Sequence, residues 1–134
     1  MGQKIIKGVK HLLQDANQIV TTFNVEKCKS LLNNKDYVFV DLRDYREILK
    51  DGKIPRAFSC PRGMLEFWID PDSPYHKKFF NQDKTYIFYC ASAWRSALAV
   101  KVAMEMGLSP VVHLKGGFSM WLKQGGTIEI INKK

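Results

Sequence analysis

The stretch "YIFYCASAWRSALAVKVAMEMG", residues 86–107, joins a run of large apolar residues to a long helical pattern through a cysteine. The aromatic run before Cys90 is typical of a buried strand, and the spacing of apolar residues after Arg95 is typical of a helix. Gly107 ends the helical pattern, as glycine commonly does at the carboxyl end of a helix. The stretch therefore predicts a strand, a short loop that begins at Cys90, and a helix.

The predicted loop places a thiol where a helix begins. Unpaired backbone amides and the positive end of the helix dipole favour a thiolate over a thiol at such a position. Arg95 adds a fixed positive charge, and the amides of the short loop are expected to curl around the sulfur of Cys90. The sequence thus predicts a concave anion cradle with a nucleophile at its floor.

Strand and helix patterns alternate along the rest of the chain, from Asn24 onward. Asn24 and Gly52 are predicted helix ends, one as an amino-terminal cap and one as a carboxyl-terminal stop. Further strands are predicted within residues 37–44, 54–63 and 110–114, and residues 127–131 are a last strand or a tail. This order predicts an α/β fold with a central parallel β-sheet flanked by helices on both faces. Ligands of such sheets bind at the carboxyl ends of the strands, where Cys90 lies.

The first twenty residues have a helical pattern of their own. The chain is therefore divided into an N-terminal amphipathic helical extension, residues 1–20, and one domain, residues 21–134. The apolar positions at helical spacing are Ile5, Val9, Leu12, Leu13 and Ala16. We expect this helix to pack on the domain, and a membrane-surface or partner-binding helix is the alternative.

The composition narrows the class of partner. The chain has 134 residues and a formal charge of +8, with lysines spread along its length. Such a field attracts anions, and the sequence has no nucleic-acid-binding motif, so small anions or an acidic protein partner are expected and nucleic acid is not. No apolar run is long enough to span a membrane and no signal peptide is recognisable, so a cytoplasmic location is expected.

The chain contains only three cysteines. This odd, sparse set indicates free thiols in a reducing compartment, and neither the cysteines nor the scattered histidines have metal-ligand spacing. Cys28 falls on an apolar helical stripe and is expected in the core. Cys60 follows a predicted strand, so a role as a resolving thiol near the crevice stays open for it.

Five segments in this order resemble the single-domain rhodanese-like sulfurtransferases (the rhodanese homology domain). The resemblance runs from about Asn24 to Gly126 and rests on "VFVDLRD", "GKIPRA", "CPRGMLEFW", "YCASAWRS" and "VVHLKGGFSMW". It implies a sulfurtransferase in which Cys90 takes a sulfane sulfur from a thiosulfate-like anionic donor. Cys90 would hold the sulfur as a persulfide and pass it to cyanide or a thiol, without a cofactor or metal.

The resemblance also implies roles for individual residues. Arg95 would order the loop and draw the anion in, and Asp41 would support the loop. Arg56 and Arg62 are candidate contacts for the anionic end of the donor. The residues whose amides would stabilise the persulfide are Ala91, Ser92, Ala93, Trp94 and Ser96.

The sequence departs from the family pattern at three places. Lys53 stands where the family usually has His, and Arg56 stands where it usually has Gly. Ala93 and Trp94 stand where many relatives have two glycines, so the loop must either use ordinary helical angles or carry strain. Trp94 would also place a large ring at the rim of the pocket.

Two other functions are compatible with parts of the pattern. Tyrosine phosphatases also use a cysteine, a loop and an arginine, but with five intervening residues, whereas four separate Cys90 from Arg95 here. A shorter loop encloses a smaller anion. The second alternative is a non-catalytic or sulfur-relay module of the same fold that binds a protein partner.

Overall fold

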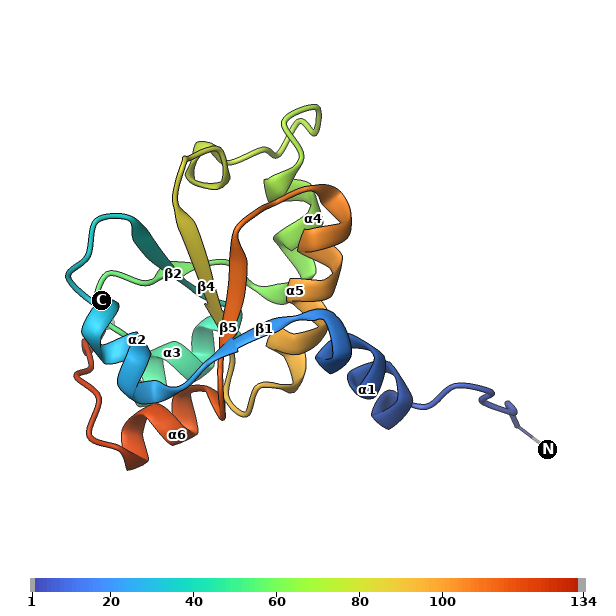
Figure 1. Ribbon diagram of the computed structural model, residues 1–134, viewed down its shortest axis with the longest axis horizontal. Helices are drawn as coiled ribbons and strands as arrows, with labels where there is room; N and C mark the ends of the chain where they lie inside the picture. The colour runs from blue at the N-terminus through green and yellow to red at the C-terminus, as the bar shows by residue number, and fades with distance from the viewer. Residues whose placement is uncertain (1, 133–134) are drawn as a thin grey trace.

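The computed structural model describes residues 2–132, and its centre is a five-stranded sheet with the strand order β1-β5-β4-β2-β3 (Figure 1). All four strand pairings of this sheet are parallel. The strands are β1 (Thr21–Phe23), β2 (Tyr37–Asp41), β3 (Phe58–Ser59), β4 (Thr85–Tyr89) and β5 (Val111–Leu114).

Helices cover both faces of the sheet. The α-helices are α1 (Val9–Ile19), α2 (Val25–Leu31), α3 (Tyr45–Asp51), α4 (Leu65–Ile69), α5 (Trp94–Met106) and α6 (Gly117–Lys123). Two short 3₁₀ turns, η1 (Arg62–Met64) and η2 (Lys78–Phe80), flank α4 and its following loop. Helices α4 and α5 pack on one face, whereas α2 and α6 pack on the other. The predicted α/β class, a parallel sheet flanked by helices on both faces, is confirmed.

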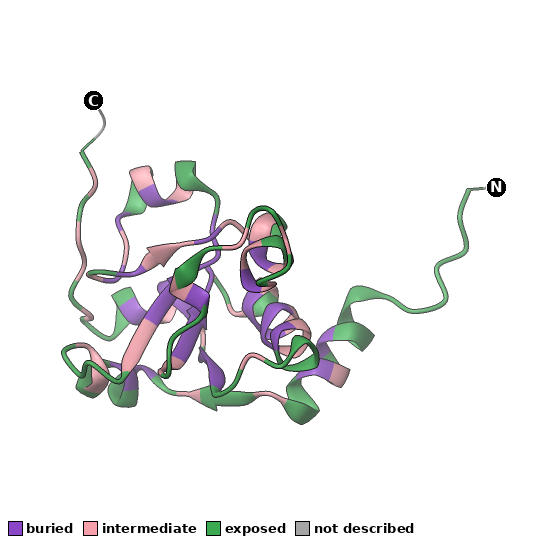
Figure 2. Cartoon of the chain, turned by 90° about the horizontal axis from the view of Figure 1, so that it is seen from above, coloured by how far each residue is buried: buried purple, intermediate pink, exposed green. Residues whose placement is uncertain are grey.

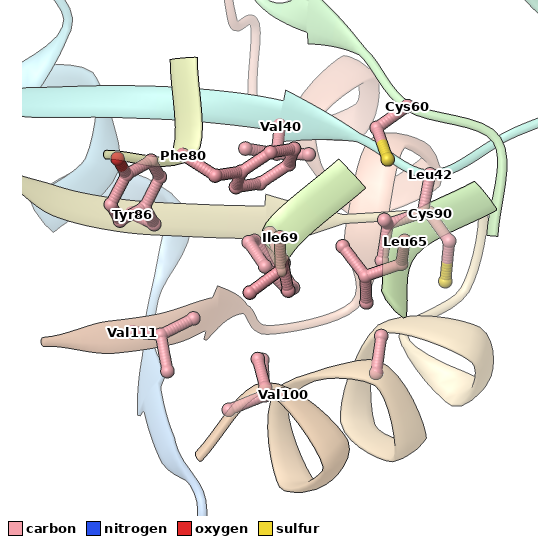
Figure 3. Close-up of a cluster of buried hydrophobic side chains, with 13 residues drawn as sticks. Val40, Leu42, Cys60, Leu65, Ile69, Phe80, Tyr86, Cys90, Val100 and Val111 are labelled. Carbon is pink, nitrogen blue, oxygen red and sulfur yellow. The ribbon is translucent and has the colours of Figure 1, made fainter. Parts of the chain in front are cut away.

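Strand β4 is buried on both faces, and this burial accounts for its continuous apolar run. Tyr86 and Phe88 point into the cluster beneath α4 and α5, and Ile87 and Tyr89 point into the cluster beneath α2 and α6. Because both faces of a parallel strand are buried, the strand has no polar alternation. Figure 3 shows the first cluster, with Cys60 and Cys90 at the same end of it.

The predicted helix ends are confirmed by their local geometry. The Asn24 side chain accepts a hydrogen bond from the Lys27 amide at 2.8 Å, which caps α2. Gly52 ends α3 with φ 81°, and Gly107 ends α5 with φ 99°. These positive φ angles are readily reached by glycine, which lacks a Cβ.

The sequence patterns did not predict β1. It is a three-residue edge strand with Thr21 and Thr22 exposed, so it carries almost no apolar signal of its own. Its position comes from pairing with β5. At the other end of the chain, residues 127–131 form a tail that makes one antiparallel bridge, between Glu129 and Lys53.

Helix α1 packs against α5, as expected for a helix that covers the domain. Leu13 and Ala16 are buried and form a small cluster with Ala97 of α5. The helix begins only at Val9, so Ile5 lies in the exposed segment before it (Figure 2). Within residues 2–132 no helix has the length and apolar character to cross a membrane.

Replacing Leu13 with alanine should lower the free energy of unfolding by about 2 kcal/mol, because it removes buried methyl groups between α1 and α5. The Leu12→Ala variant is the matched control, since Leu12 is 41% exposed on the same helix. Its cost should stay within about 0.5 kcal/mol. Urea denaturation measures both, and equal losses would contradict the docking of α1.

Candidate active site

The loop between β4 and α5 holds Cys90 at the carboxyl end of the sheet. Strand β4 ends at Tyr89, and α5 starts at Trp94, so four residues make the connection. Cys90 is 1% exposed, and its Sγ accepts a hydrogen bond from the Ser96 amide at 3.3 Å. The structure therefore brings the predicted thiol and the predicted amide of Ser96 together at the start of a helix.

The amino end of α6 holds the backbone of this loop. The Phe118 amide donates to the Cys90 carbonyl at 2.8 Å, and the Ser119 amide donates to the Ala91 carbonyl at 3.0 Å. A Cβ on Gly117 would lie 2.6 Å from the Cys90 carbonyl oxygen and 2.7 Å from the Ala91 carbonyl. Only glycine allows this approach, so Gly117 lets α6 dock directly on the loop.

Ala93 has a strained backbone conformation, which is one of the two alternatives expected for the loop; the other was ordinary helical angles. Its φ is 79° and its ψ is −3°, which is the left-handed region. For a residue with a Cβ this costs roughly 1–2 kcal/mol. Trp94 follows as the first residue of α5, with its ring half exposed beside the loop.

Arg95 is held by a carboxylate. Its guanidinium makes two hydrogen bonds to the Glu47 carboxylate, at 2.9 and 3.0 Å. This pairing raises the pKa of Arg95 and lowers that of Glu47. Glu47 Oε1 also accepts from the Asp44 amide at 3.0 Å as part of the capping box of α3. Arg95 thus links the first turn of α5 to α3, and its charge is shared with a carboxylate rather than left free to draw in an anion.

Asp41 lies in a buried ion pair at the end of β2. It accepts from Arg43 Nη2 at 2.8 Å and Nε at 3.0 Å, and the Tyr89 hydroxyl donates to it at 2.6 Å. Asp41 and Arg43 are 0% and 1% exposed. Because Tyr89 precedes Cys90, the network braces the strand end from which the loop starts. Sequence reasoning missed Arg43, although its place directly after a buried strand in "DLRD" was a usable signal.

Arg62 and Arg56, the two other arginines predicted to contact the donor, lie in different parts of the fold. Arg62 lies near the end of β2, where its amide donates to the Leu42 carbonyl at 3.2 Å, and its side chain pairs with Glu66 at 2.9 Å. The structure does not bring Arg56 to the loop. Its guanidinium donates to the Leu32 carbonyl and the Asn33 side chain, both at 2.8 Å.

The prediction that Arg56 contacts the donor is therefore corrected. Arg56 borders a hollow of about 360 Å³ that is also lined by Tyr37 and Lys84, the residues at or just before the amino ends of β2 and β4. Cys90 follows the opposite end of β4. Arg56 does adopt a positive φ, 66°, at the place where the family pattern usually has Gly.

A buried row of hydrogen-bonded polar side chains adjoins Ser96, and no pattern in the sequence predicts it. His113 of β5 is 3% exposed, with its Nδ1 2.9 Å from Ser96 Oγ and its Nε2 3.1 Å from Thr22 Oγ1. Burial lowers the pKa of His113 to about 4, so the ring is neutral at neutral pH. These hydrogen bonds hold the Ser96 side chain in place. Ser96 is also the residue whose amide faces the Cys90 sulfur.

The two remaining cysteines lie in the core. Cys28 and Cys60 are both 0% exposed, and burial raises the pKa of each to about 12. Both are therefore protonated at neutral pH and poor nucleophiles. Across residues 2–132, no cluster of His, Cys, Asp or Glu side chains could hold a metal ion.

Several known proteins are similar to this chain in sequence or in structure. A family model described as a rhodanese-like domain matches residues 24–124. Thiosulfate sulfurtransferase/rhodanese-like domain-containing protein 3 of Mus musculus is 32% identical over 111 residues, 79% of this chain and 68% of that protein. A protein named sulfurtransferase from Allochromatium vinosum is 30% identical over 95 residues, 71% of this chain and 80% of that protein. A solved structure of a protein of unknown function from Rhodopseudomonas palustris, described as a possible tyrosine phosphatase, is 53% identical with a TM-score of 0.94, covering 96% of this chain and 99% of its own.

The Ala93→Gly variant should raise the free energy of unfolding by about 0.5–1 kcal/mol, because glycine adopts the left-handed angles without steric cost. The control is Ala103→Gly, in the buried helical part of α5, which should lower it by about 1 kcal/mol. Thermal and urea unfolding measure both changes. A loss of stability in Ala93→Gly would contradict the strained loop.

The pair between Glu47 and Arg95 should give a pH-dependent stability. Because the pKa of Glu47 is lowered from 4.5 in the folded chain, the pair stabilises above that pH and is lost as the pH falls through the lowered pKa. In the Glu47→Gln variant, glutamine can still serve the capping box, so the comparison isolates the charge. We expect a deficit of about 0.5 kcal/mol at pH 7 that shrinks as the pH falls below 4.5 and disappears once Glu47 is protonated in the folded chain. A deficit of the same size at every pH would contradict a contribution from the charge of Glu47.

Proposed function

The chain belongs to the family of rhodanese-like domains, and from that premise we propose that it is a sulfurtransferase that carries a sulfur atom on Cys90. The observation that carries the proposal is the hydrogen bond from the Ser96 amide to the Cys90 sulfur at the start of α5. Backbone amides and the helix dipole at that place stabilise a negative sulfur, first the thiolate and then the persulfide. The relatives named sulfurtransferases support the same reaction class.

In the proposed first step the Cys90 thiolate attacks the outer sulfur of a thiosulfate-like donor. A bond forms between the two sulfurs, the bond inside the donor breaks, and sulfite leaves with the electron pair. Cys90 then carries a persulfide whose outer sulfur lies about 2 Å further out. The amides of the loop would hold its negative charge as an oxyanion hole holds a developing charge.

In the second step an acceptor removes the outer sulfur. A thiolate or cyanide attacks that sulfur, the bond to Cys90 breaks, and the Cys90 thiolate is restored. The product is an acceptor persulfide or thiocyanate. We also propose the cytoplasm as the compartment, because all three cysteines are free and free thiols persist in reducing surroundings.

The paired arginine and the short loop support a persulfide sulfur over a phosphate as the anion that the loop holds. Phosphatase cradles need a free arginine to bind the phosphate oxygens, whereas Arg95 here is already paired with Glu47. The four-residue spacing between Cys90 and Arg95 also makes a smaller cradle. A sulfur-relay role, with a protein as the acceptor, uses the same persulfide and differs only in the second step.

The test is the intact mass of the protein before and after incubation with thiosulfate. The wild type should gain one sulfur atom and lose it on addition of cyanide. The Cys90→Ser variant should show no gain. The Cys28→Ser and Cys60→Ser variants are the matched controls and should gain sulfur as the wild type does, because both thiols are buried and protonated.

Three results would overturn the proposal. A sulfur gain that survives in Cys90→Ser would place the carrier elsewhere. Absence of any gain with thiosulfate, together with hydrolysis of p-nitrophenyl phosphate that depends on Cys90, would favour a phosphatase. Absence of both activities would favour a binding module.

A further inference from the structure

A hollow lies at the amino edge of the sheet, opposite the edge that carries Cys90. It measures about 360 Å³ and borders the amino ends of β2 and β4. We name it the amino-edge hollow, and it is lined by residues 32–35 and 37–39, Pro55, Arg56 and Lys84. Lys84 and Cys90 flank β4, so an extended strand of roughly 20 Å separates them. A ligand in this hollow is therefore remote from the reacting sulfur.

Arg56 is held beside the amino-edge hollow at a conformational cost. Its φ is 66°, and within residues 2–132 Ala93 is the only other residue with a Cβ that has a positive φ. Glycine adopts this angle without a steric cost. Strained backbone of this kind persists where the surrounding contacts hold it, and it is found most often at ligand sites and active sites. The turn alone thus gives no reason for an arginine at this position.

The guanidinium of Arg56 is fixed in place, and part of it is free to bind. Its Nη2 donates to the Leu32 carbonyl and to Asn33 Oδ1, both at 2.8 Å. Its Nε and Nη1 have no acceptor among residues 2–132. A guanidinium is planar, and its donors match the oxygens of a phosphate or a carboxylate. Arg56 therefore presents donors whose orientation is already set.

The two asparagines of the lining also present donors. Asn33 Oδ1 accepts from Arg56, and Asn34 Oδ1 accepts from the Asp36 amide at 2.9 Å. Because both side-chain oxygens are used, the remaining polar atoms of these side chains are NH₂ groups. The polar lining thus consists mainly of donors, which suits a ligand with several acceptor oxygens.

The carboxyl end of α2 does not oppose an anion here. Unpaired carbonyls at such a helix end repel negative charge. The Leu31 carbonyl accepts from the Asn34 amide at 3.0 Å, and the Leu32 carbonyl accepts from Arg56. These two carbonyls are therefore covered by donors.

Three cations border the amino-edge hollow, namely Lys35, Arg56 and Lys84. None of them has an ion-pair partner among residues 2–132. The lining contains no Asp or Glu. The nearby Glu129 carboxylate accepts from the Arg56 backbone amide at 3.0 Å instead of pairing with its guanidinium. The hollow therefore has a local positive field.

The rest of the lining is apolar. Leu32 and Tyr37 are half-buried and pack against the core cluster beneath α2 and α6, and Phe39 belongs to that cluster. Val38 and Pro55 complete the apolar part. Covering such a surface with a flat apolar group removes apolar area from water, which favours binding. The hollow thus suits a ligand with an anionic end and an apolar ring.

We propose that the amino-edge hollow is a second binding site, for a small phosphate ester of an aromatic group. Three cations match the nearly double negative charge of a phosphate monoester better than the single charge of a carboxylate. The Arg56 donors and the asparagine NH₂ groups contact the phosphate oxygens, and the ring covers Tyr37 and Leu32. The volume is near the small end of the range for ligand pockets, which suits one ring and one phosphate.

Binding is tested by titrating the wild type with phenyl phosphate while the backbone amide resonances are followed by NMR. The largest shifts should fall on Asn33, Asn34 and Lys35. Phenyl phosphate should bind about tenfold more tightly than inorganic phosphate, which has no ring. It should also bind more tightly than benzoate, which carries a single charge.

Arg56→Gly is the decisive variant, because glycine keeps the positive φ without strain. Its urea unfolding midpoint should stay close to that of the wild type, whereas its affinity for phenyl phosphate should fall about tenfold. Lys84→Gln should weaken binding about threefold. Arg46→Gln is the matched control, since it removes one positive charge from the first turn of α3 at the opposite edge, and it should leave the affinity unchanged.

Two further ligands distinguish a nucleotide from a phosphorylated amino acid. Adenosine monophosphate has a sugar between its ring system and its phosphate, whereas in O-phosphotyrosine the phosphate is attached to the ring. The one that binds more tightly identifies the source of the phosphate ester. If neither exceeds the affinity of inorganic phosphate, the proposal is overturned.

Three other results would also overturn it. Equal affinity in Arg56→Gly and the wild type would exclude the guanidinium from the site. Equal affinity for phenyl phosphate and inorganic phosphate would exclude the apolar lining. Shifts centred on residues 91–96 would place the anion at the Cys90 loop. None of these results depends on a persulfide, so this site and the proposed function are judged separately.

Discussion

The carboxyl edge of the sheet depends on the buried pair between Asp41 and Arg43. Two charges removed from water are tolerable only if each finds partners, and here Arg43 also donates to the Gly52 carbonyl at 2.7 Å while Tyr89 donates to Asp41. The pair therefore joins the end of β2, the end of α3 and the end of β4. Cys90 is the next residue after Tyr89, so this network sets the position of the thiol.

The loop itself is fixed from outside rather than by its own sequence. Helix α6 holds the carbonyls of Cys90 and Ala91, and Glu47 of α3 holds Arg95. These attachments on both sides explain how Ala93 can remain in a left-handed conformation that glycine would adopt more easily. A rigid, pre-shaped loop is what a cradle of amides requires, since donors already in place need no reorganisation when charge develops.

The parts of this site that are local in sequence were predictable, and the parts that join distant segments were not. The apolar run before Cys90 and the stop at Gly107 are read from neighbouring residues, and both predictions agree with the structure. The pairing of Arg95 with Glu47 spans 48 residues, and no pattern in the chain indicates it. The approach of His113 to Ser96 likewise depends on where β5 lies. The wrong prediction for Arg56 also concerns distant segments. The order of motifs along the sequence does not show at which end of the sheet the Arg56 side chain lies.

Strand β1 can pair with β5 only after β5, which lies far along the sequence, has been synthesised. Thr22 of β1 and His113 of β5 are 91 residues apart in sequence, yet they share a hydrogen bond at the sheet edge. At a synthesis rate of roughly 5–20 residues per second, α1 and β1 wait on the order of 5–20 seconds for their neighbour to emerge. In the last part of that interval, after Cys90 has been added, the nascent chain has its thiol but lacks His113 beside Ser96 and α6 beneath the loop. The contacts that hold the loop are therefore completed late, when nearly the whole domain has been synthesised.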